Sequence, residues 1–358
     1  MNPLRAAVIG TGALGKHHAR ILSGLQGVNL SAIAELHEAS GRAVADKHNT
    51  RWVADYHDLL GEIDMAVVAV PTVAHFRIAR ELLSAGVDLF VEKPLTPTAD
   101  QARELVELAE EQGRILQVGH VERFNPGFVA ARAAIHDPKY IRSERVSPYT
   151  YRSTDIGVVF DMMIHDIDLV LNLVGQPLVS VEAFGVSIMG GHEDAVQARL
   201  RFTGGCIADL SANRVSPTTS RAMQVWSSDG CAQIDFGARE SQIYSATPTL
   251  LFGTPPLERV RQPGANLEQL KAEVFGTYIG VEKPLATPRD QLTEELVDFE
   301  RAVRTRSAPQ VDGAQGLAAV EVAEAILGSV AAHQWDASPQ GRVGALRAAP
   351  LVPLKKAG

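Results

Sequence analysis

Short apolar runs alternate with amphipathic stretches over the first 120 residues. A short run of apolar residues without alternation is typical of a strand buried on both faces, whereas apolar residues three or four positions apart are typical of a helix with one buried face. Strand and helix patterns that follow one another predict a parallel sheet with helices on both sides. The predicted strands are residues 6–9, 30–34, 66–70, 89–91 and 115–118, and the predicted helices include 17–25, 75–85 and 99–111.

The pattern changes after residue 121. Residues 155–175 have the composition of one long helix, and a series of strand patterns follows it. From residue 195 to residue 202, apolar and polar side chains alternate, which predicts a strand with one buried face. Turns at 204–205 and 229–230 join successive strands into antiparallel hairpins. The chain is helical again from residue 291, so this part is predicted to be an α+β domain.

These patterns predict two domains. We expect an α/β domain over residues 1–121 and an α+β domain over residues 122–335. The last strong helix pattern, about residues 313–334, is expected to pack back on the first domain. The tail, residues 336–358, is rich in basic residues and proline, so we expect it to be poorly ordered and assign it no function.

Composition narrows the class of protein. Of the 358 residues, 46% are hydrophobic and 21% are charged, which is ordinary for a globular chain and excludes a disordered one. The formal net charge of −8 is evenly shared: residues 1–120 carry 11 basic and 15 acidic side chains, and the remainder carries 23 and 27. Because neither part is basic, we expect no nucleic-acid partner and favour a small soluble substrate.

The expected location is the cytoplasm. The two cysteines, Cys206 and Cys231, suit reduced thiols and are too few for a disulfide framework or a zinc site. No apolar run approaches the roughly 18 residues of a membrane span. The N-terminus lacks the basic and apolar regions of a signal peptide, so we expect neither export nor a membrane partner.

A glycine motif joins the first predicted strand to the first predicted helix. Gly10, Gly12 and Gly15 have the spacing of a dinucleotide-binding turn, with Ala13 and Leu14 between them. The first glycine permits a tight turn, and the second lets the backbone approach a pyrophosphate at the helix N-terminus. The third lets the helix pack closely on the sheet. The motif therefore predicts a dinucleotide site.

A carboxylate follows at the place where such a site needs one. Glu35 stands 20 residues after Gly15, at the end of the second predicted strand, where it would accept hydrogen bonds from the adenine ribose. Leu36 and His37 come next, with no arginine to neutralise a 2′-phosphate. NAD is therefore favoured over NADP. The alternative is a glycine turn followed by a surface glutamate.

Glu92, Lys93 and Pro94 follow the fourth predicted strand, at the sheet edge where ligands bind. We expect the proline to hold Lys93 extended, and a nearby cationic nicotinamide to lower the pKa of the lysine, which makes Lys93 a candidate proton acceptor. The motif alone would also suit a surface turn. Its sequence recurs at 281–285, but only the first copy ends a strand of the predicted parallel sheet, so Lys283 is interpreted as a linker residue.

The helix predicted over residues 155–175 carries candidate acid–base residues. Asp161 and His165 are four residues apart and so share a face. We expect Asp161 to fix the tautomer of His165, which titrates near neutral pH and is a candidate base. Asp166 and Asp168 lie on other faces, as surface charges or substrate contacts. One histidine among carboxylates is a poor metal site, so no metal is expected.

Taken in order, these motifs resemble the Gfo/Idh/MocA oxidoreductase family over about residues 5–335. The resemblance implies an N-terminal Rossmann domain that binds NAD(P) and a C-terminal α/β domain with a large, mostly antiparallel open sheet. That second domain supplies substrate contacts and often a homodimer or homotetramer interface. Lys93, Asp161 and His165 match the catalytic set of the family. The matching cofactor contacts include Pro71, Thr72, His75 and Glu92.

Residues 119–126 and 151–159 are similar to the family branch that contains UDP-N-acetylglucosamine 3-dehydrogenases. That similarity implies oxidation of a C3 hydroxyl on a nucleotide sugar, with an aminotransferase as a possible pathway partner. Arg123 and Arg152 are then candidate diphosphate or hydroxyl contacts, although each also suits plain packing. His120 is a candidate for the nicotinamide pocket or a hydrogen-bonded structural histidine. Further candidate substrate contacts are Asn125 and Asp166.

Other functions remain open at this point. A dehydrogenase of the same family for a polyol, an inositol or a free sugar would not need a UDP group on its substrate. An NAD-dependent glycoside hydrolase would release a sugar without net NADH. A nicotinamide-binding regulator would need no chemistry, and the presence of lysine, aspartate and histidine together argues against it.

Overall fold

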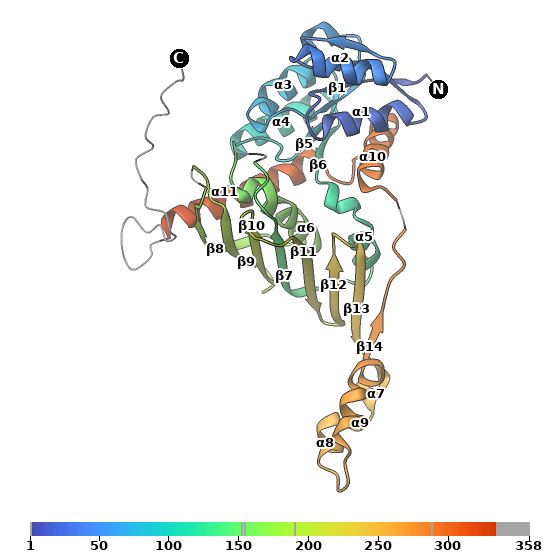
Figure 1. Ribbon diagram of the computed structural model, residues 1–358, viewed down its shortest axis with the longest axis vertical. Helices are drawn as coiled ribbons and strands as arrows, with labels where there is room; N and C mark the ends of the chain where they lie inside the picture. Colours follow the sequence, from blue (N-terminus) through green and yellow to red (C-terminus); the bar gives the residue numbers. More distant parts are fainter. Residues whose placement is uncertain (1, 152, 154, 190, 288, 334–358) are drawn as a thin grey trace.

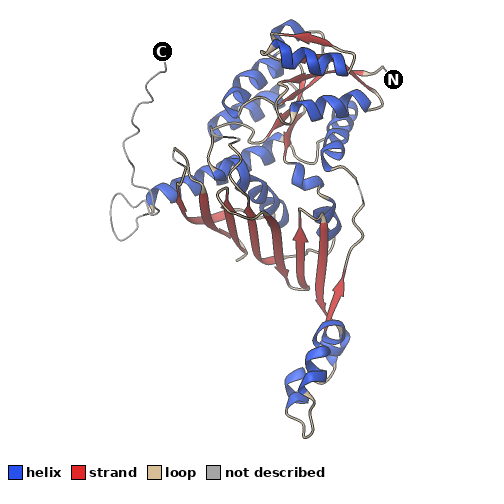
Figure 2. Cartoon of the chain, in the orientation of Figure 1, coloured by secondary structure: helices blue, strands red, loops and turns tan. Residues whose placement is uncertain are grey.

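The computed structural model describes residues 2–333, except residues 152, 154, 190 and 288. The chain builds two sheets; most helices lie around the first sheet or against one face of the second, and a group of short helices extends beyond the end of the second (Figures 1 and 2). The N-terminal sheet is coloured blue to teal in Figure 1 and the second sheet green to orange. Both predicted sheet types, one parallel and one mostly antiparallel, are confirmed.

The first sheet has six parallel strands in the order β3-β2-β1-β4-β5-β6. The order reverses between β1 and β4, and a ligand binds at such a point in a doubly wound sheet. The sequence patterns missed β3, because this three-residue edge strand is not uniformly apolar. The elements are β1 (Leu4–Ile9), α1 (Gly15–Gly24), β2 (Val28–Ala34), α2 (Glu38–Lys47), β3 (Arg51–Val53), η1 (Tyr56–Leu59), β4 (Met65–Val68), α3 (Thr72–Ser84), β5 (Asp88–Glu92), α4 (Ala99–Glu111) and β6 (Leu116–Gly119).

The second sheet has eight strands in the order β14-β13-β12-β11-β7-β10-β9-β8. The predicted hairpins are β9–β10 and β11–β12, and β7 lies between them, parallel to β10. All other neighbours in this sheet are antiparallel. The strands are β7 (Pro138–Val146), β8 (Leu178–Val186), β9 (Ala195–Phe202), β10 (Ile207–Asn213), β11 (Ser220–Ser227), β12 (Gly230–Asp235), β13 (Glu240–Ala246) and β14 (Ile279–Glu282).

The helix predicted over residues 155–175 begins later and has two parts. A π-helical turn, η3 (Val159–Met163), leads directly into α6 (Ile164–Val174), which contacts β7. π-Helical turns within helices occur frequently at functional sites. The chain enters this domain through η2 (Val121–Phe124) and α5 (Pro126–Arg132) and leaves it through α10 (Gln291–Thr305) and α11 (Gly313–Ala332).

Helix α11 connects the two sheets. Near its middle, Glu324 accepts a hydrogen bond from the backbone N–H of Ala99 on α4 at 3.1 Å. Near its end, the Ser329 hydroxyl accepts one from the N–H of Ala183 on β8 at 2.8 Å. By length and mean hydropathy, 1.3 over 18 residues, α11 alone among the helices of the described residues has the dimensions of a membrane span. This is the helix predicted over about residues 313–334, and it packs on both domains.

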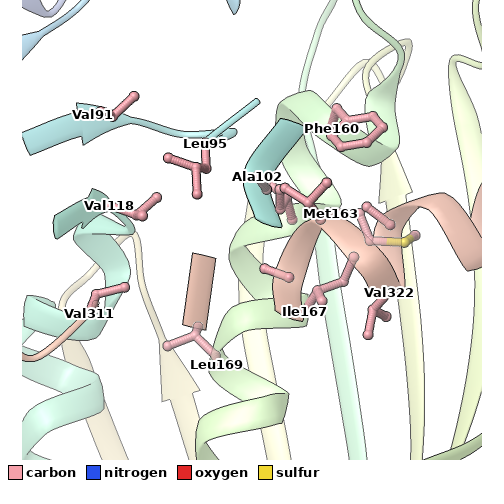
Figure 3. Packing of buried hydrophobic residues seen from close by; sticks show 14 of the residues in the cluster. Val91, Leu95, Ala102, Val118, Phe160, Met163, Ile167, Leu169, Val311 and Val322 are labelled. Carbon is pink, nitrogen blue, oxygen red and sulfur yellow. The ribbon is translucent and has the colours of Figure 1, made fainter. Parts of the chain in front are cut away.

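The hydrophobic core is continuous between the domains. One cluster of buried side chains includes Val91 and Val118 from the first sheet, Met163 from η3, Ile167 from α6, and Val322 from α11 (Figure 3). Burial of apolar surface contributes about 25 cal/mol per Å². Because the two sheets share this cluster, it fixes the carboxyl ends of the parallel strands next to the start of α6.

A helical arm extends from one end of the second sheet (Figure 1). It follows β13 and returns through β14, and none of its three short helices has a buried residue. The arm lies at the opposite end of the molecule from the first sheet (Figure 1). Its helices are α7 (Pro248–Phe252), α8 (Pro256–Val260) and α9 (Leu267–Ala272), followed by the π-helical turn η4 (Val274–Tyr278).

Candidate active site

The glycine motif forms a tight turn after β1. Gly10 has φ of +92°, and a Cβ atom there would lie 2.7 Å from the carbonyl oxygen of Ala69. A Cβ atom on Gly15 would lie 2.0 Å from the carbonyl oxygen of Gly10. By contrast, a Cβ atom on Gly12 would meet nothing within 4 Å. The turn is therefore closed on the sheet side and open at its tip, which leaves room for a pyrophosphate above the N-terminus of α1.

A cavity of about 650 Å³ lies at the carboxyl ends of the parallel strands. It joins the glycine turn to the start of η3 in the second domain. Of the predicted cofactor residues, Gly15, His75 and His120 are not in its wall. Ser153, Asp155, Ile156 and Arg77 also line it, and the sequence analysis had not assigned them a site. The predicted residues in its wall are Gly10, Gly12, Ala13, Leu14, Glu35, Pro71, Thr72, Glu92, Lys93 and Asp161.

Glu35 lines this cavity as a carboxylate. One oxygen accepts hydrogen bonds from the N–H and hydroxyl of Thr11, both at 2.8 Å, and the other accepts from the N–H of His37 at 3.0 Å. Burial alone would raise the pKa of Glu35, but these hydrogen bonds outweigh it and lower the pKa. A negative charge therefore lies in the cavity wall beside the glycine turn.

His75 connects α3 to the turn after β5. Its two ring nitrogens lie 2.8 Å from the carbonyl oxygen of Pro94 and 2.9 Å from that of Val70. Burial lowers the pKa of this histidine, so the neutral ring donates to one of the two carbonyls. The structure thus places His75 behind the Lys93 turn. The Lys93–Pro94 peptide bond is cis, which the sequence analysis did not foresee.

Lys93 and Asp161 meet at the inner end of the cavity. The Lys93 ammonium donates to the backbone carbonyl of Asp161 at 2.5 Å, and one oxygen of the Asp161 carboxylate lies 3.4 Å away. Both side chains are partly exposed, at 15% and 24%. The predicted pairing of Asp161 with His165 is wrong: within the described part of the chain they share no hydrogen bond, because Asp161 turns toward the lysine.

Two histidines lie near this pair, outside the wall of the cavity; His120 is buried and His165 is partly buried. The rings of His120 and His165 are 6.5 Å apart and perpendicular to each other. Burial, then the charge of Lys93 and of other nearby cations, lowers the pKa of His165 well below its usual value. Burial also lowers the pKa of His120. Both rings are therefore neutral at physiological pH, and His165 suits a proton acceptor.

His120 is not the hydrogen-bonded structural histidine weighed as an alternative. Neither of its ring nitrogens has a hydrogen-bond partner among the described residues, and the same holds for Nδ1 of His165. Buried polar atoms of this kind are usually satisfied by a ligand or by water. The pair therefore suits a place where another molecule approaches.

Glu92 is held by a residue that the sequence analysis missed. Nε2 of His18, on α1, lies 2.6 Å from one Glu92 oxygen, and both side chains are buried. The other Glu92 oxygen accepts from the N–H of Lys93 at 3.3 Å. His18 therefore fixes the end of β5. The sequence signal for this role was the position of His18 on the apolar face of the first predicted helix.

The predicted substrate contacts of Arg123 and Asn125 are corrected. Arg123 makes two hydrogen bonds to Asp168, at 2.6 and 2.8 Å, with both side chains almost fully buried. The amide of Asn125 donates to Glu122 at 3.0 Å and to the carbonyl of Phe236 at 3.1 Å. Neither residue lines the cavity. A buried charge needs a partner, and here the protein itself supplies it.

Asp166 is corrected in the same way. It is neither a surface charge nor a cavity residue, because it pairs with Arg145 through two hydrogen bonds at 3.0 and 3.1 Å. Glu122 shares the same arginine at 2.8 Å. These side chains hold the start of α6 against β7 and η2. Arg152, the remaining candidate substrate contact, lies outside the described residues, as does the predicted tail.

Glu295 on α10 gives a prediction about stability. Its carboxyl group is fully buried, and neither oxygen has a hydrogen-bond partner within the described residues. Burial, with the nearby charge of Glu92, raises its pKa well above the ordinary 4.5. Between these two values, the folded protein keeps a proton that the unfolded chain loses, so stability falls as the pH rises, by at most about 1.4 kcal/mol per pH unit.

Glu295→Gln removes this titration. Relative to the unmodified protein, its free energy of unfolding should therefore rise as the pH increases from about 5 to 8. Urea denaturation at several pH values measures the difference. Glu107→Gln, on the exposed face of α4, is the control and should show no such gain. A Glu295→Gln curve parallel to that of the unmodified protein would contradict a protonated buried carboxyl.

The chain matches known oxidoreductases over most of its length. Residues 4–120 match the oxidoreductase family described as NAD-binding Rossmann fold, and residues 127–233 match the GFO/IDH/MocA C-terminal domain. UDP-N-acetylglucosamine 3-dehydrogenase of Acidithiobacillus ferrooxidans is 31% identical over 87% of this chain and 93% of its own length. Inositol 2-dehydrogenase of Rhizobium meliloti is 30% identical over 59% of this chain and 69% of its own.

Solved structures agree with these matches. The structure of the Acidithiobacillus ferrooxidans enzyme superposes with a TM-score of 0.79 and 29% identity, over 92% of this chain and 98% of that one. The protein is thus an oxidoreductase with an NAD-binding Rossmann domain. It belongs to the Gfo/Idh/MocA family, and its relatives are sugar and inositol dehydrogenases that act on CH–OH groups.

Proposed function

We propose that this protein is an NAD-dependent dehydrogenase that oxidises the C3 hydroxyl of UDP-N-acetylglucosamine to a ketone. The observation that carries the proposal is the match to the Acidithiobacillus ferrooxidans enzyme over 93% of the length of that protein. The inositol dehydrogenases match a smaller part of this chain. A polyol dehydrogenase is the second candidate, because those relatives share the same Rossmann domain.

In this proposal, three residues have separate roles in the reaction. Lys93, anchored by Asp161 at the inner end of the cavity, contacts the reacting oxygen and orients it. His165 is neutral because of its depressed pKa, so it has a lone pair that can take the hydroxyl proton. Bound NAD supplies the nicotinamide that accepts the hydride. The protein thus orients the reacting groups and supplies one base, and none of its own side chains is consumed.

The residues around the cavity fit an NAD molecule. The open tip of the glycine turn suits the pyrophosphate, and the ionised Glu35 suits the two ribose hydroxyls of NAD. Because that carboxylate would repel a 2′-phosphate, we favour NAD over NADP. The proposal also includes a cytoplasmic location, a homodimer or homotetramer, and an aminotransferase that consumes the keto sugar.

The decisive measurement is NADH formation with UDP-N-acetylglucosamine. UDP-glucose, N-acetylglucosamine and myo-inositol serve as matched substrates, and NADP replaces NAD in a parallel series. Oxidation of a secondary alcohol by NAD is unfavourable near neutral pH, so a carbonyl trap removes the ketone. We expect turnover with UDP-N-acetylglucosamine, and little with the free sugar or with NADP.

Other outcomes point to the alternatives. Turnover of myo-inositol at least equal to that of the nucleotide sugar would establish a polyol dehydrogenase. Sugar release from a glycoside without net NADH would indicate the NAD-dependent hydrolase. Tight NAD binding without any turnover would indicate a regulator.

A further inference from the structure

Arg221 belongs to the second sheet, outside the wall of the cofactor cavity, and neither the motifs nor the relatives assign it a role. It is the second residue of β11, directly opposite Arg145 of β7. Along β11, Arg221 is on the same face as the buried residues Met223 and Val225. That face of the sheet is the one against which α6 packs, since Arg145 reaches Asp166 on α6. Arg221 therefore points toward the helix that carries His165.

The guanidinium of Arg221 is open to an external anion. Its side chain is exposed, near the start of β11 and before the buried residues of that strand. Within the residues that the structure describes, its guanidinium has no hydrogen-bond or ion-pair partner. Arg145 opposite is also positive, and both of its nearby carboxylates, Glu122 and Asp166, are already bound to it. These two carboxylates hydrogen-bond to Arg145 and not to Arg221, so the N–H donors of Arg221 are available to an anion from outside the chain.

Arg221 is also close to the proposed chemistry. After burial, the nearby charges of Lys93, Arg145, His120 and Arg221 lower the pKa of His165. Lys93 is in the wall of the cofactor cavity, at the end of the first sheet, whereas Arg221 belongs to the second sheet. His165 is therefore near both Lys93, from the cofactor cavity, and Arg221, from the second sheet. A substrate whose hydroxyl lies at Lys93 and His165 would thus place its remainder toward Arg221.

We propose that Arg221 binds the anionic part of the substrate, a phosphate or diphosphate ester attached to the sugar. The planar guanidinium offers two parallel N–H donors to such a group. This inference deepens the proposed function and rests on it, since an inositol or free sugar would give the arginine no anion to bind. It also replaces Arg123, which is committed to Asp168, as the residue that distinguishes a nucleotide sugar from its free sugar.

The test is isothermal titration calorimetry, in which UDP is added to the NADH-loaded protein and the dissociation constant is measured. Arg221→Ala should weaken UDP binding by about 10- to 100-fold, the usual effect of losing a hydrogen bond to a charged group. Arg221→Lys should lose less, because it keeps the positive charge. Arg142→Ala removes an exposed arginine from the opposite face of the same sheet and should leave UDP binding unchanged. Uridine, which has no phosphate, should bind equally to all four proteins.

Kinetics give a second measurement. With UDP-N-acetylglucosamine, Arg221→Ala should raise KM by a similar factor and leave kcat within about threefold, since Arg221 binds the substrate away from the reacting carbon. Unmodified protein that binds UDP no better than Arg221→Ala does would overturn the role of Arg221 and leave the proposed function standing. Unmodified protein that neither binds UDP nor oxidises the nucleotide sugar would overturn both.

Discussion

Lys93→Met should lower kcat by about 10²- to 10⁴-fold, the usual contribution of a group that moves or orients the reacting proton. Methionine keeps the length of the side chain but cannot contact the substrate oxygen through a charged donor. Binding of NAD should be unchanged, because the glycine turn and Glu35 lie at the other end of the cavity. Steady-state NADH formation measures kcat, and quenching of protein fluorescence by added NADH measures cofactor binding.

The chain contains its own control for this experiment. Lys283 occupies the same place in the second copy of the sequence VEKPL, but there it is exposed and follows β14, next to the helical arm. Lys283→Met should therefore leave both kcat and NADH binding unchanged. Equal loss in the two variants would mean that the effect is not specific to the cavity. Full activity of Lys93→Met would reject the catalytic role of Lys93.

The cofactor half of the candidate site was predictable because its signals are local. Gly10, Gly12 and Gly15 act within one turn, and the fixed spacing to Glu35 follows from one helix and one strand. Each of these constraints is imposed by residues close in the chain. The structure accordingly places the turn and the carboxylate along one cavity.

The substrate half was less predictable because its pairings are distant in the chain. Arg123 pairs with Asp168, which is 45 residues further along the chain, and Arg145 pairs with Asp166, which is 21 residues further along. Nothing in the neighbourhood of Arg123 shows whether it will be buried with a partner or exposed to a ligand. The same is true of Arg221, whose direction is known only once the register of β11 against β7 is known.

The fold shows a similar limit. The hairpins of the second sheet were predicted from alternation and turns, but the position of β7, parallel to β10 and between two hairpins, depends on a non-local pairing. The helical arm was missed because helices of five or six residues give too little periodicity to recognise. The π-helical turn before α6 likewise has no sequence pattern of its own.

Arg145→Met should lower the free energy of unfolding by about 3–5 kcal/mol, the usual cost of breaking a buried ion pair by removing one partner. Arg145 is 3% exposed, and its guanidinium satisfies both Asp166 and Glu122. Without it, two carboxylates remain buried together. Burial already raises the pKa of Asp166 with the arginine present. The variant should therefore take up protons as the pH falls, and its loss in free energy of unfolding should be smaller at lower pH.

Arg5→Met is the matched control for this prediction. Arg5 also lies on a strand and makes two side-chain hydrogen bonds to one carboxylate, Asp64, at 2.7 and 3.2 Å, but that pair is solvent-exposed. Because exposed pairs stabilise proteins little, Arg5→Met should cost far less than Arg145→Met. Urea denaturation at pH 7 compares the two. Equal losses would mean that the buried arginine does not hold α6 against the second sheet, and that the position of His165 is set by apolar packing alone.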